Sequence, residues 1–249
     1  MIKKLTFIFS FSILTVVVSA QNLKDTIISI PFINLSYSPQ IPGADFGKRF
    51  GFTNSIGLSA GVKTAKNWTF ELEGSFLFGK KIKEDSLLDF LQTDEGYIID
   101  QYGDAVNVLL FQRGFTESFM VGKLFPVIGP NLNSGIVVKF GAGFMHHKIR
   151  IENQDDKVPA LTKANLVYVD RLTMGLSLKQ YIGYQYFSDR KLVNFNIGLE
   201  FTEGFTQGMR DYQFGYGEYR ENRTEFLMGI RAGWVFPIYR KTPEEFYLD

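Results

Sequence analysis

The stretch from Thr224 to Tyr239, TEFLMGIRAGWVFPIY, constrains the fold more than any other part of the chain. Its residues alternate between a bulky apolar face and a face of small residues that includes the cation Arg231. A period of two indicates a β-strand, because successive side chains point to opposite faces of a sheet. Such a strand fits lipid on one side and a crowded polar lumen on the other. The apolar face carries Phe226, Met228, Ile230, Ala232, Trp234 and Phe236.

Composition supports a closed barrel over other membrane-spanning structures. After residue 20, no stretch approaches the roughly 18 apolar residues that a spanning helix needs. Aromatic residues nevertheless make up 16% of the chain, with 25 Phe and 12 Tyr, while the mean hydropathy is near zero. Alternating strands produce this combination, and only a closed barrel leaves no unpaired strand edge in hydrocarbon. We therefore expect an all-β, closed antiparallel transmembrane barrel.

Charge and cysteine content exclude several other classes. The net charge of +1 gives no whole-chain electrostatic basis for binding nucleic acid. The absence of cysteine excludes disulfides and thiolate metal sites. We expect neither a cofactor nor a metal ion.

The first 20 residues have the composition of a secretory signal peptide. Lys3 and Lys4 supply the positive segment, residues 5–18 the apolar core, and Val18-Ser19-Ala20 the small-residue cleavage site. Cleavage there predicts a mature chain from Gln21. The expected organisation is a signal peptide at 1–20, a barrel domain at 21–239 and a periplasmic tail at 240–249.

Alternation, prolines and glycines divide the mature chain into eight expected strands. The connections between them are long and short in turn, apart from one of moderate length at 126–135. This asymmetry is typical of outer-membrane barrels, which have short periplasmic turns and long extracellular loops. The longest connection carries a short helical pattern at 84–92. The strands are expected at 30–38, 53–63, 68–78, 114–125, 136–148, 171–186, 192–202 and 224–239.

The fourth expected strand has a mixed pattern. Phe119 and Val121 belong on the outward face, but Glu117 and Lys123 share their parity. Either a bulge shifts the register or the two charges lie at the two membrane interfaces. The sequence leaves both alternatives open.

The final strand adds a positional pattern to its alternation. Arg231, Gly233, Phe236 and Ile238 follow the spacing polar-x-Gly-x-x-apolar-x-apolar, which resembles the assembly signal in the last strand of bacterial outer-membrane barrels. With the signal peptide and the eight strands, the chain resembles small barrels of the OmpA, OmpX and OmpW type, in the aromatic-rich version abundant in Bacteroidota. The resemblance implies the cell outer membrane as location. It also implies membrane lipid, lipopolysaccharide and the outer-membrane assembly machinery as partners.

The inward-facing positions of the expected strands carry both acidic and basic residues. An eight-stranded barrel is just wide enough for side chains to fill it, so we expect these charges to pair into a structural plug. A gated narrow pore is the alternative. The predicted lumen charges are Glu71, Glu73, Glu200, Lys63, Lys139, Lys179 and Arg231.

Two sets of aromatic residues have separate expected roles. Outward rings near strand ends predict an interfacial girdle at headgroup depth: Trp68, Tyr184, Tyr186, Trp234 and Phe236. The glycine-rich loop before the last strand predicts either an adaptable partner-contact surface or an extension of the last hairpin above the membrane. Its aromatic residues are Phe205, Tyr212, Phe214, Tyr216 and Tyr219.

The sequence offers no convincing catalytic constellation. His146 and His147 are the only histidines, at the outer end of the fifth strand. Some small barrels are lipid-modifying enzymes with a serine, a histidine and an acid near the outer leaflet. No serine follows in this strand and the two rings point to opposite faces, so we expect interfacial histidines and no catalytic residue.

We expect a non-enzymatic barrel that serves as a structural or interaction component of the cell envelope, including as a subunit of a larger outer-membrane complex. A narrow channel for small solutes is the first alternative, and a lipid-modifying enzyme is the second. The alternative fold is a soluble β-sandwich or lipocalin-like barrel, which would expose the aromatic bands or need a large interior to hold them.

Overall fold

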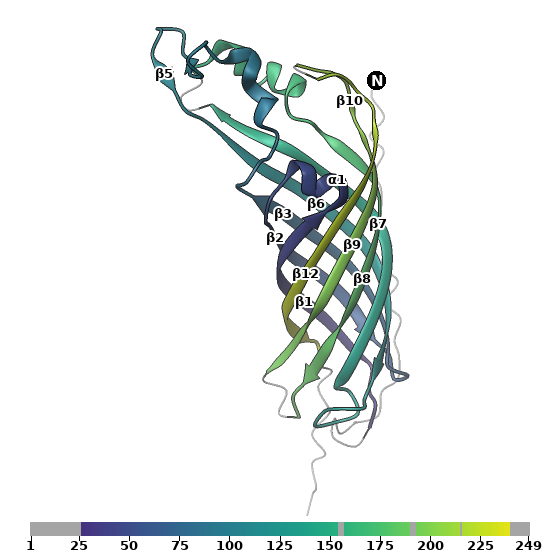
Figure 1. Cartoon of the computed structure of the whole chain (residues 1–249). Coiled ribbons are helices and arrows are strands. Elements are labelled where there is room, and N and C mark those ends of the chain that lie inside the picture. Colours follow the sequence, from purple (N-terminus) through teal and green to yellow (C-terminus); the bar gives the residue numbers. More distant parts are fainter. Residues whose placement is uncertain (1–25, 154–156, 190–192, 215, 240–249) are drawn as a thin grey trace, which may run out of the picture.

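The computed structural model describes residues 26–153, 157–189, 193–214 and 216–239. The predicted signal peptide at 1–20 and the predicted tail at 240–249 lie outside these ranges. Eight antiparallel strands close into one barrel in the order β1-β12-β9-β8-β7-β6-β3-β2 (Figure 1). The strands are β1 (Ile30–Gly43), β2 (Thr53–Lys63), β3 (Trp68–Gly79), β6 (Val108–Phe125), β7 (Gly135–Asn153), β8 (Thr173–Phe187), β9 (Asn194–Gly208) and β12 (Asn222–Pro237).

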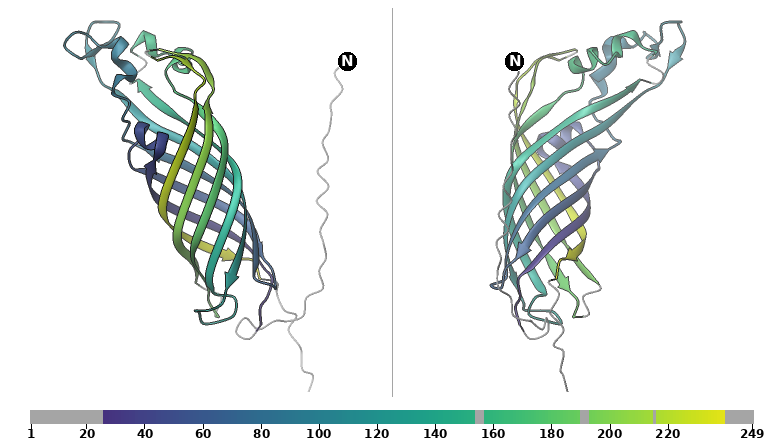
Figure 2. Two further views of the ribbon diagram at one scale, coloured as in Figure 1. Left: turned by 45° about the vertical axis from the view of Figure 1, so that its right-hand side comes forward. Right: turned by 180° about the vertical axis from the view of Figure 1, so that it is seen from behind.

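The two ends of the barrel differ. The strand connections 64–67 and 126–134 and the described residues of 188–193 lie at one end, called the inner end. At the other, outer end lie α1 (Ala44–Arg49) and three long connections with small elements of their own (Figures 1 and 2). These elements are the 3₁₀ helices η1 (Asp85–Leu91), η3 (Pro159–Leu161) and η4 (Asn165–Tyr168), and the hairpins β4 (Ile98–Ile99) with β5 (Ala105–Val106) and β10 (Arg210–Gln213) with β11 (Gly217–Tyr219). Within the described ranges, no helix has the length and apolar character to cross a membrane.

The predicted eight-stranded antiparallel barrel is confirmed, and most differences lie at the outer end. β2 has the predicted bounds, whereas β7 continues to Asn153 and β9 to Gly208. β1 also runs past Pro39 and Pro42 to Gly43, beyond the predicted end at residue 38. Turn-forming and polar residues therefore mark where the lipid-facing pattern ends, while backbone pairing continues into the part of the barrel that the loops surround.

The fourth barrel strand, β6, contains no bulge. Its register with β3 runs without a shift from Trp68↔Lys123 to Gly79↔Gln112, and its register with β7 is equally continuous. The bulge alternative is therefore wrong. Lys123 lies at the inner end, where its ammonium donates to the Lys66 carbonyl, as the interface alternative predicts. Glu117 is exposed on the lipid-facing surface opposite Phe144 of β7, so the interface alternative is wrong for Glu117.

The faces of the barrel are sorted as the alternation predicts. Outward side chains such as Leu58, Leu72 and Phe140 are at least 60% exposed, while the inward positions beside them are buried and mainly polar. In water this continuous apolar surface would be strongly unfavourable, and the bulky rings do not fill the centre. The soluble alternatives therefore fail, and the chain is an outer-membrane barrel with lipid around its apolar belt.

The predicted girdle residues all lie at one end. Trp68 begins β3, Tyr184 and Tyr186 lie near the end of β8, and Trp234 and Phe236 lie near the end of β12. The Trp234 and Phe236 rings are stacked with centroids 5.9 Å apart. These aromatics therefore mark the inner membrane interface only.

A charge in the middle of the belt tests the lipid-facing assignment. We expect Ile230→Arg to lower the free energy of unfolding in lipid vesicles by about 2–4 kcal/mol, because the guanidinium would lie in hydrocarbon. Ile128→Arg is the matched control, since Ile128 is 65% exposed in an inner-end turn. Chemical denaturation of the vesicle-embedded protein measures both, and equal losses would contradict the assignment.

Candidate functional site

Six of the predicted lumen charges form one network, called the lumen cluster. Arg231 donates to Glu73 at 2.6 Å and to Glu200 at 3.1 Å. Lys179 lies 3.2 Å from Glu200 and also pairs with Glu73. Lys139 pairs with Glu71. All six residues are buried, and the three acids and three cations balance. Its members are Glu71, Glu73, Glu200, Lys139, Lys179 and Arg231.

Lys63 does not join this cluster. Its ammonium donates to the carbonyl of Ile28 at 2.9 Å and to the side chain of Asn67 at 2.8 Å, at the inner end of the barrel. Parity placed Lys63 correctly inside the barrel, but parity carries no information on height along the axis. Grouping it with the cluster was wrong for that reason.

Neutral side chains complete the filling of the lumen. Gln40 of β1 donates to Glu200 at 2.8 Å, and Ser75 donates to Glu73 at 2.9 Å. The Tyr181 ring lies 5.5 Å from the Arg231 guanidinium and packs in a buried apolar group with Met120, Leu124 and Val137. A buried ionic network next to packed side chains is the plug that we expected for a barrel of this width.

A second closure lies above the cluster, where α1 folds into the outer mouth. Phe46 and Phe50 are fully buried, with ring centroids 4.7 and 5.5 Å from the ring of His147. Asp45 accepts from the Thr224 backbone N–H at 3.0 Å, which ties α1 to β12. The hydrogen bond from Lys48, followed by that from Thr224, lowers the pKa of Asp45. Two fully buried aromatic rings therefore cap the lumen.

The two histidines face opposite sides, as predicted. His146 lies on the lipid-facing surface, with its ring centroid 6.0 Å from that of Phe115. His147 points inward and lies 3.1 Å from the carboxylate of Glu225. Across the residues that the structure describes, no group of three or more His, Asp or Glu side chains is arranged to hold a metal ion.

The outer connections form a compact layer, called the outer crown, which comprises the described residues of 80–107, 157–172 and 209–221. Its apolar residues continue the buried cluster of the capped mouth: Leu87 and Leu88 of η1 and Leu161 of η3 pack in one group with Phe46 and Phe50. Loops that share a hydrophobic core hold a defined shape, unlike loops that only span strand ends.

Polar contacts around Arg171 tie the crown loops together. Arg171 pairs with Glu84 at 3.3 Å, and Glu84 also pairs with Arg49 of α1. The Arg171 guanidinium donates to the Phe214 carbonyl at 3.2 Å. Burial raises the pKa of Tyr219, so its hydroxyl stays protonated and donates to the Arg171 carbonyl at 3.3 Å. Arg171 therefore contacts both of the other crown loops.

Four aromatic side chains from three crown loops meet at the surface and form the aromatic patch: Phe90, Tyr168, Tyr212 and Phe214. The Phe214 ring is central, with its centroid 5.2 Å from Phe90, 5.5 Å from Tyr168 and 5.8 Å from Tyr212. Each of the four side chains is between 37% and 52% exposed. Clustered aromatic rings that remain half-exposed are typical of contact surfaces.

The predicted contact loop is divided by the structure. Phe205 belongs to β9 and lies on the lipid-facing surface, and Tyr219 is buried beneath the crown. Including these two in the contact surface was therefore wrong. Tyr212, Phe214 and Tyr216 are exposed, on or beside the β10–β11 hairpin. The hairpin continues the register of β9 with β12: Gln207 pairs with Asn222, the Gly208 N–H donates to the Glu221 carbonyl at 3.2 Å, and Arg210 pairs with Tyr219. The loop therefore extends the last barrel hairpin, as the second of the two alternatives predicted.

The sequence did not reveal Phe90 and Tyr168 as members of the patch. In the segment DSLLDFL, the structure buries Leu87 and Leu88 and leaves Phe90 exposed. Phe90 therefore lies off the apolar side of η1. Nothing local distinguishes Tyr168, because its role depends on how three loops far apart in the sequence meet.

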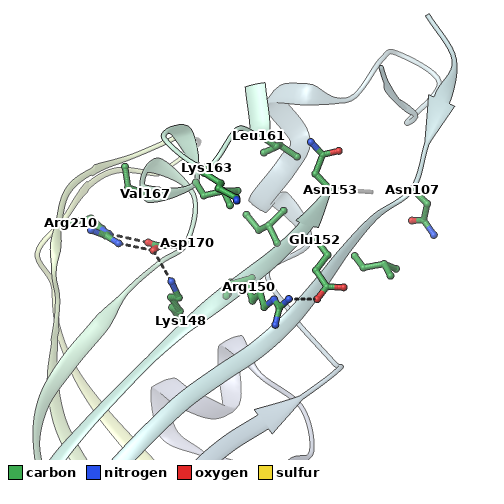
Figure 3. Close-up of a pocket in the computed structure, with 14 residues that line it drawn as sticks. Asn107, Lys148, Arg150, Glu152, Asn153, Leu161, Lys163, Val167, Asp170 and Arg210 are labelled. Atoms are coloured by element: carbon green, nitrogen blue, oxygen red, sulfur yellow. Dashed lines mark hydrogen bonds and ion pairs between the residues drawn. The ribbon is translucent and has the colours of Figure 1, made fainter. Parts of the chain in front are cut away.

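A pocket of about 770 Å³ opens between the outer part of β7 and the loop that carries η3 and η4 (Figure 3). Apolar side chains such as Leu161 and Leu166 line one part of it. Asp170 accepts two hydrogen bonds from Arg210, at 2.7 and 3.0 Å, and Arg150 lies 2.8 Å from Glu152. With Lys148 and Lys163, the pocket has four cations and two acids, so its lining is positively charged overall.

Comparison with known proteins gives similar folds but no family. No protein-family profile matches the chain, and no curated protein sequence matches it. One similar solved structure is that of Ail, the attachment invasion locus protein of Yersinia pestis, in complex with the heparin analogue sucrose octasulfate. It shows 10% identity, covers 84% of this chain and 99% of Ail, and has a TM-score of 0.44. The structure of Ail without that compound shows 9% identity, covers 84% of this chain and 99% of Ail, and has a TM-score of 0.44. The backbone structure of Ail in a phospholipid bilayer nanodisc shows 12% identity, covers 83% of this chain and 99% of Ail, and has a TM-score of 0.32.

The lumen cluster predicts a large stability effect from one carboxylate. We expect Glu73→Ala to lower the free energy of unfolding by about 3 kcal/mol, because Lys179 and Arg231 each lose a buried partner. Glu218→Ala, at an exposed crown position, should change it little. Denaturation in vesicles compares the two, and a Glu73→Ala protein as stable as the parent would contradict the pairing.

Proposed function

We propose that the chain is a non-conducting barrel that acts as an interaction component of the bacterial cell envelope, with the outer crown as its contact surface. The observation that carries this proposal is the aromatic patch, which brings half-exposed rings from three loops together above a shared core. Aromatic anchors bury a large area at a low cost in side-chain entropy. Loops already held in shape lose less freedom on binding.

The closed interior supports the non-conducting part of the proposal. The lumen cluster fills the barrel with paired charges, and the rings of Phe46 and Phe50 cover the outer mouth. A solute would have to displace both layers. A narrow channel is therefore the weaker alternative, and it would require α1 and the ion pairs to move together.

The belt and the final strand support the expected envelope partners. Lys148 and Arg150 lie on β7 beyond the apolar residue Phe144 and line the crown pocket, where they suit anionic headgroups such as those of lipopolysaccharide. Phe236 and Ile238 are exposed on the outer surface, as recognition by the assembly machinery would require. These features also fit an OmpA- or OmpX-type barrel, including the Bacteroidota version.

A lipid-modifying enzyme remains the second alternative. His147 and Glu225 form a buried pair below the α1 cap, whereas chemistry on lipid needs catalytic groups that the lipid can reach. Lipid analysis of a deletion strain tests this alternative. A changed acylation or deacylation pattern that the wild-type gene restores and His147→Gln does not would favour the enzyme.

Loss of the aromatic patch tests the contact role. We expect Tyr212→Ser with Phe214→Ser to remove a stoichiometric companion that co-purifies from gently solubilised native membranes. Tyr97→Ser with Tyr102→Ser is the matched control, because those two tyrosines are exposed crown residues outside the patch. Identical companions in both preparations, or none with the parent, would contradict the proposal.

The lumen cluster and the α1 cap together predict that the barrel conducts no ions. In planar bilayers we expect the parent protein to give no steady unitary conductance. Phe46→Ser with Phe50→Ser should remain silent, because the lumen cluster still fills the barrel. Reproducible unitary steps from the parent would instead support the narrow channel.

A further inference from the structure

Glu117 is a carboxylate on the lipid-facing side of the barrel. It lies on β6 between the outward residues Arg113 and Lys123 and is exposed. It lies four positions along the strand from Arg113, a distance of about 13 Å. For a strand tilted by roughly 40°, this places Glu117 about 10 Å below the level of Arg113. Its partner on β3, Gly74, lies midway between Trp68 and Lys80.

The surface around Glu117 is apolar. On β7 it is paired with Phe144, which is 59% exposed. On β6 itself, Phe119 is exposed and Phe115 half-buried. On β3, Gly74 offers no side chain to bind the carboxylate. An ionised group surrounded in this way by hydrocarbon is unfavourable, and ionisable residues at such positions mark functional contacts by default.

Within the described residues, no cation lies within ion-pair distance of the Glu117 carboxylate. Arg113 donates to the Gln112 carbonyl at 2.7 Å and lies over the ring of Phe111. Lys123 donates to the Lys66 carbonyl and lies over Trp68. His146, diagonally adjacent on β7, contacts the ring of Phe115 instead. The nearby cations therefore have other contacts.

We propose that Glu117 binds an arginine or lysine of a transmembrane segment from a second, different membrane protein. Charge complementarity carries this choice: a carboxylate at this depth needs a cation at the same depth. Lipid headgroups carry their charges at the interface. A symmetric contact with a second copy would place this surface against itself and bring two Glu117 carboxylates together. The docking surface comprises Leu72, Gly74, Phe115, Glu117, Phe119 and Phe144.

This surface is separate from the aromatic patch, so the two proposals can fail independently. The patch lies in the crown loops, whereas Glu117 faces lipid on β6, four strands around the barrel from β12. A partner could contact both, but the Glu117 contact does not require the patch. The variants below distinguish them.

Photo-crosslinking in the native membrane tests the proposal. A benzoylphenylalanine replaces Phe144, beside Glu117, or Ile230, on the opposite side of the barrel, in the full-length chain. We expect one protein adduct of defined mass from position 144 and none from position 230. Glu117→Leu should reduce the adduct at least tenfold. The control Glu203→Leu removes another outward carboxylate, on β9, and should leave the adduct unchanged, as should Tyr212→Ser with Phe214→Ser.

The stability of the purified protein gives a second readout. Without an internal partner for Glu117, the Glu117→Leu barrel should resist heat in detergent at least as well as the parent. Four results would overturn the proposal: no protein adduct at position 144, an adduct of twice the chain mass, an adduct that Glu117→Leu leaves intact, or a Glu117→Leu barrel that unfolds at a lower temperature. The second would indicate a copy of this chain, and the last an internal partner.

Discussion

The pairing of β1 with β12 is the constraint on which the rest of the structure depends. Hydrocarbon offers no partner for backbone N–H and C=O groups, so a sheet can lie in it only when its two edges meet. Ten residue pairs, from Phe32↔Pro237 to Gly43↔Phe226, join the first and last strands. Closure then fixes a sharp division of faces, with lipid against one side of every strand and the lumen against the other.

Closure with eight strands also determines what the lumen can hold. The interior is narrow enough that a Cβ at Gly233 would lie within 2.7 Å of side-chain atoms of both Asn34 and Asn196. Charged residues in so small a space must compensate each other, and the lumen cluster does so with three acids and three cations. The cap formed by α1 then leaves the crown as the part of the molecule free to vary in its contacts.

Alternation was enough to predict the barrel, its strands and the direction of nearly every side chain, because the physical difference between lipid and lumen repeats every two residues. It also placed Glu73, Lys179 and Arg231 inside. It could not give height along the axis, so Lys63 was grouped with charges that it does not reach. It could not assemble the crown either, since the contacts among Phe90, Tyr168 and Phe214 depend on long-range packing. Glu117 departs from the alternation, and the structure shows that no shift of register explains this departure.

The most direct measurement is a nitroxide scan along β8, which needs no background substitution because the chain has no cysteine. Single cysteines at positions 176, 177, 178 and 179 would be labelled in lipid vesicles, and collision with oxygen compared with that of a water-soluble nickel chelate. The lipid-facing assignment predicts high oxygen accessibility at 176 and 178, low accessibility to both reagents at 177 and 179, and thus a period of two. High nickel accessibility at 176 and 178, or no alternation, would contradict a barrel whose apolar side faces lipid.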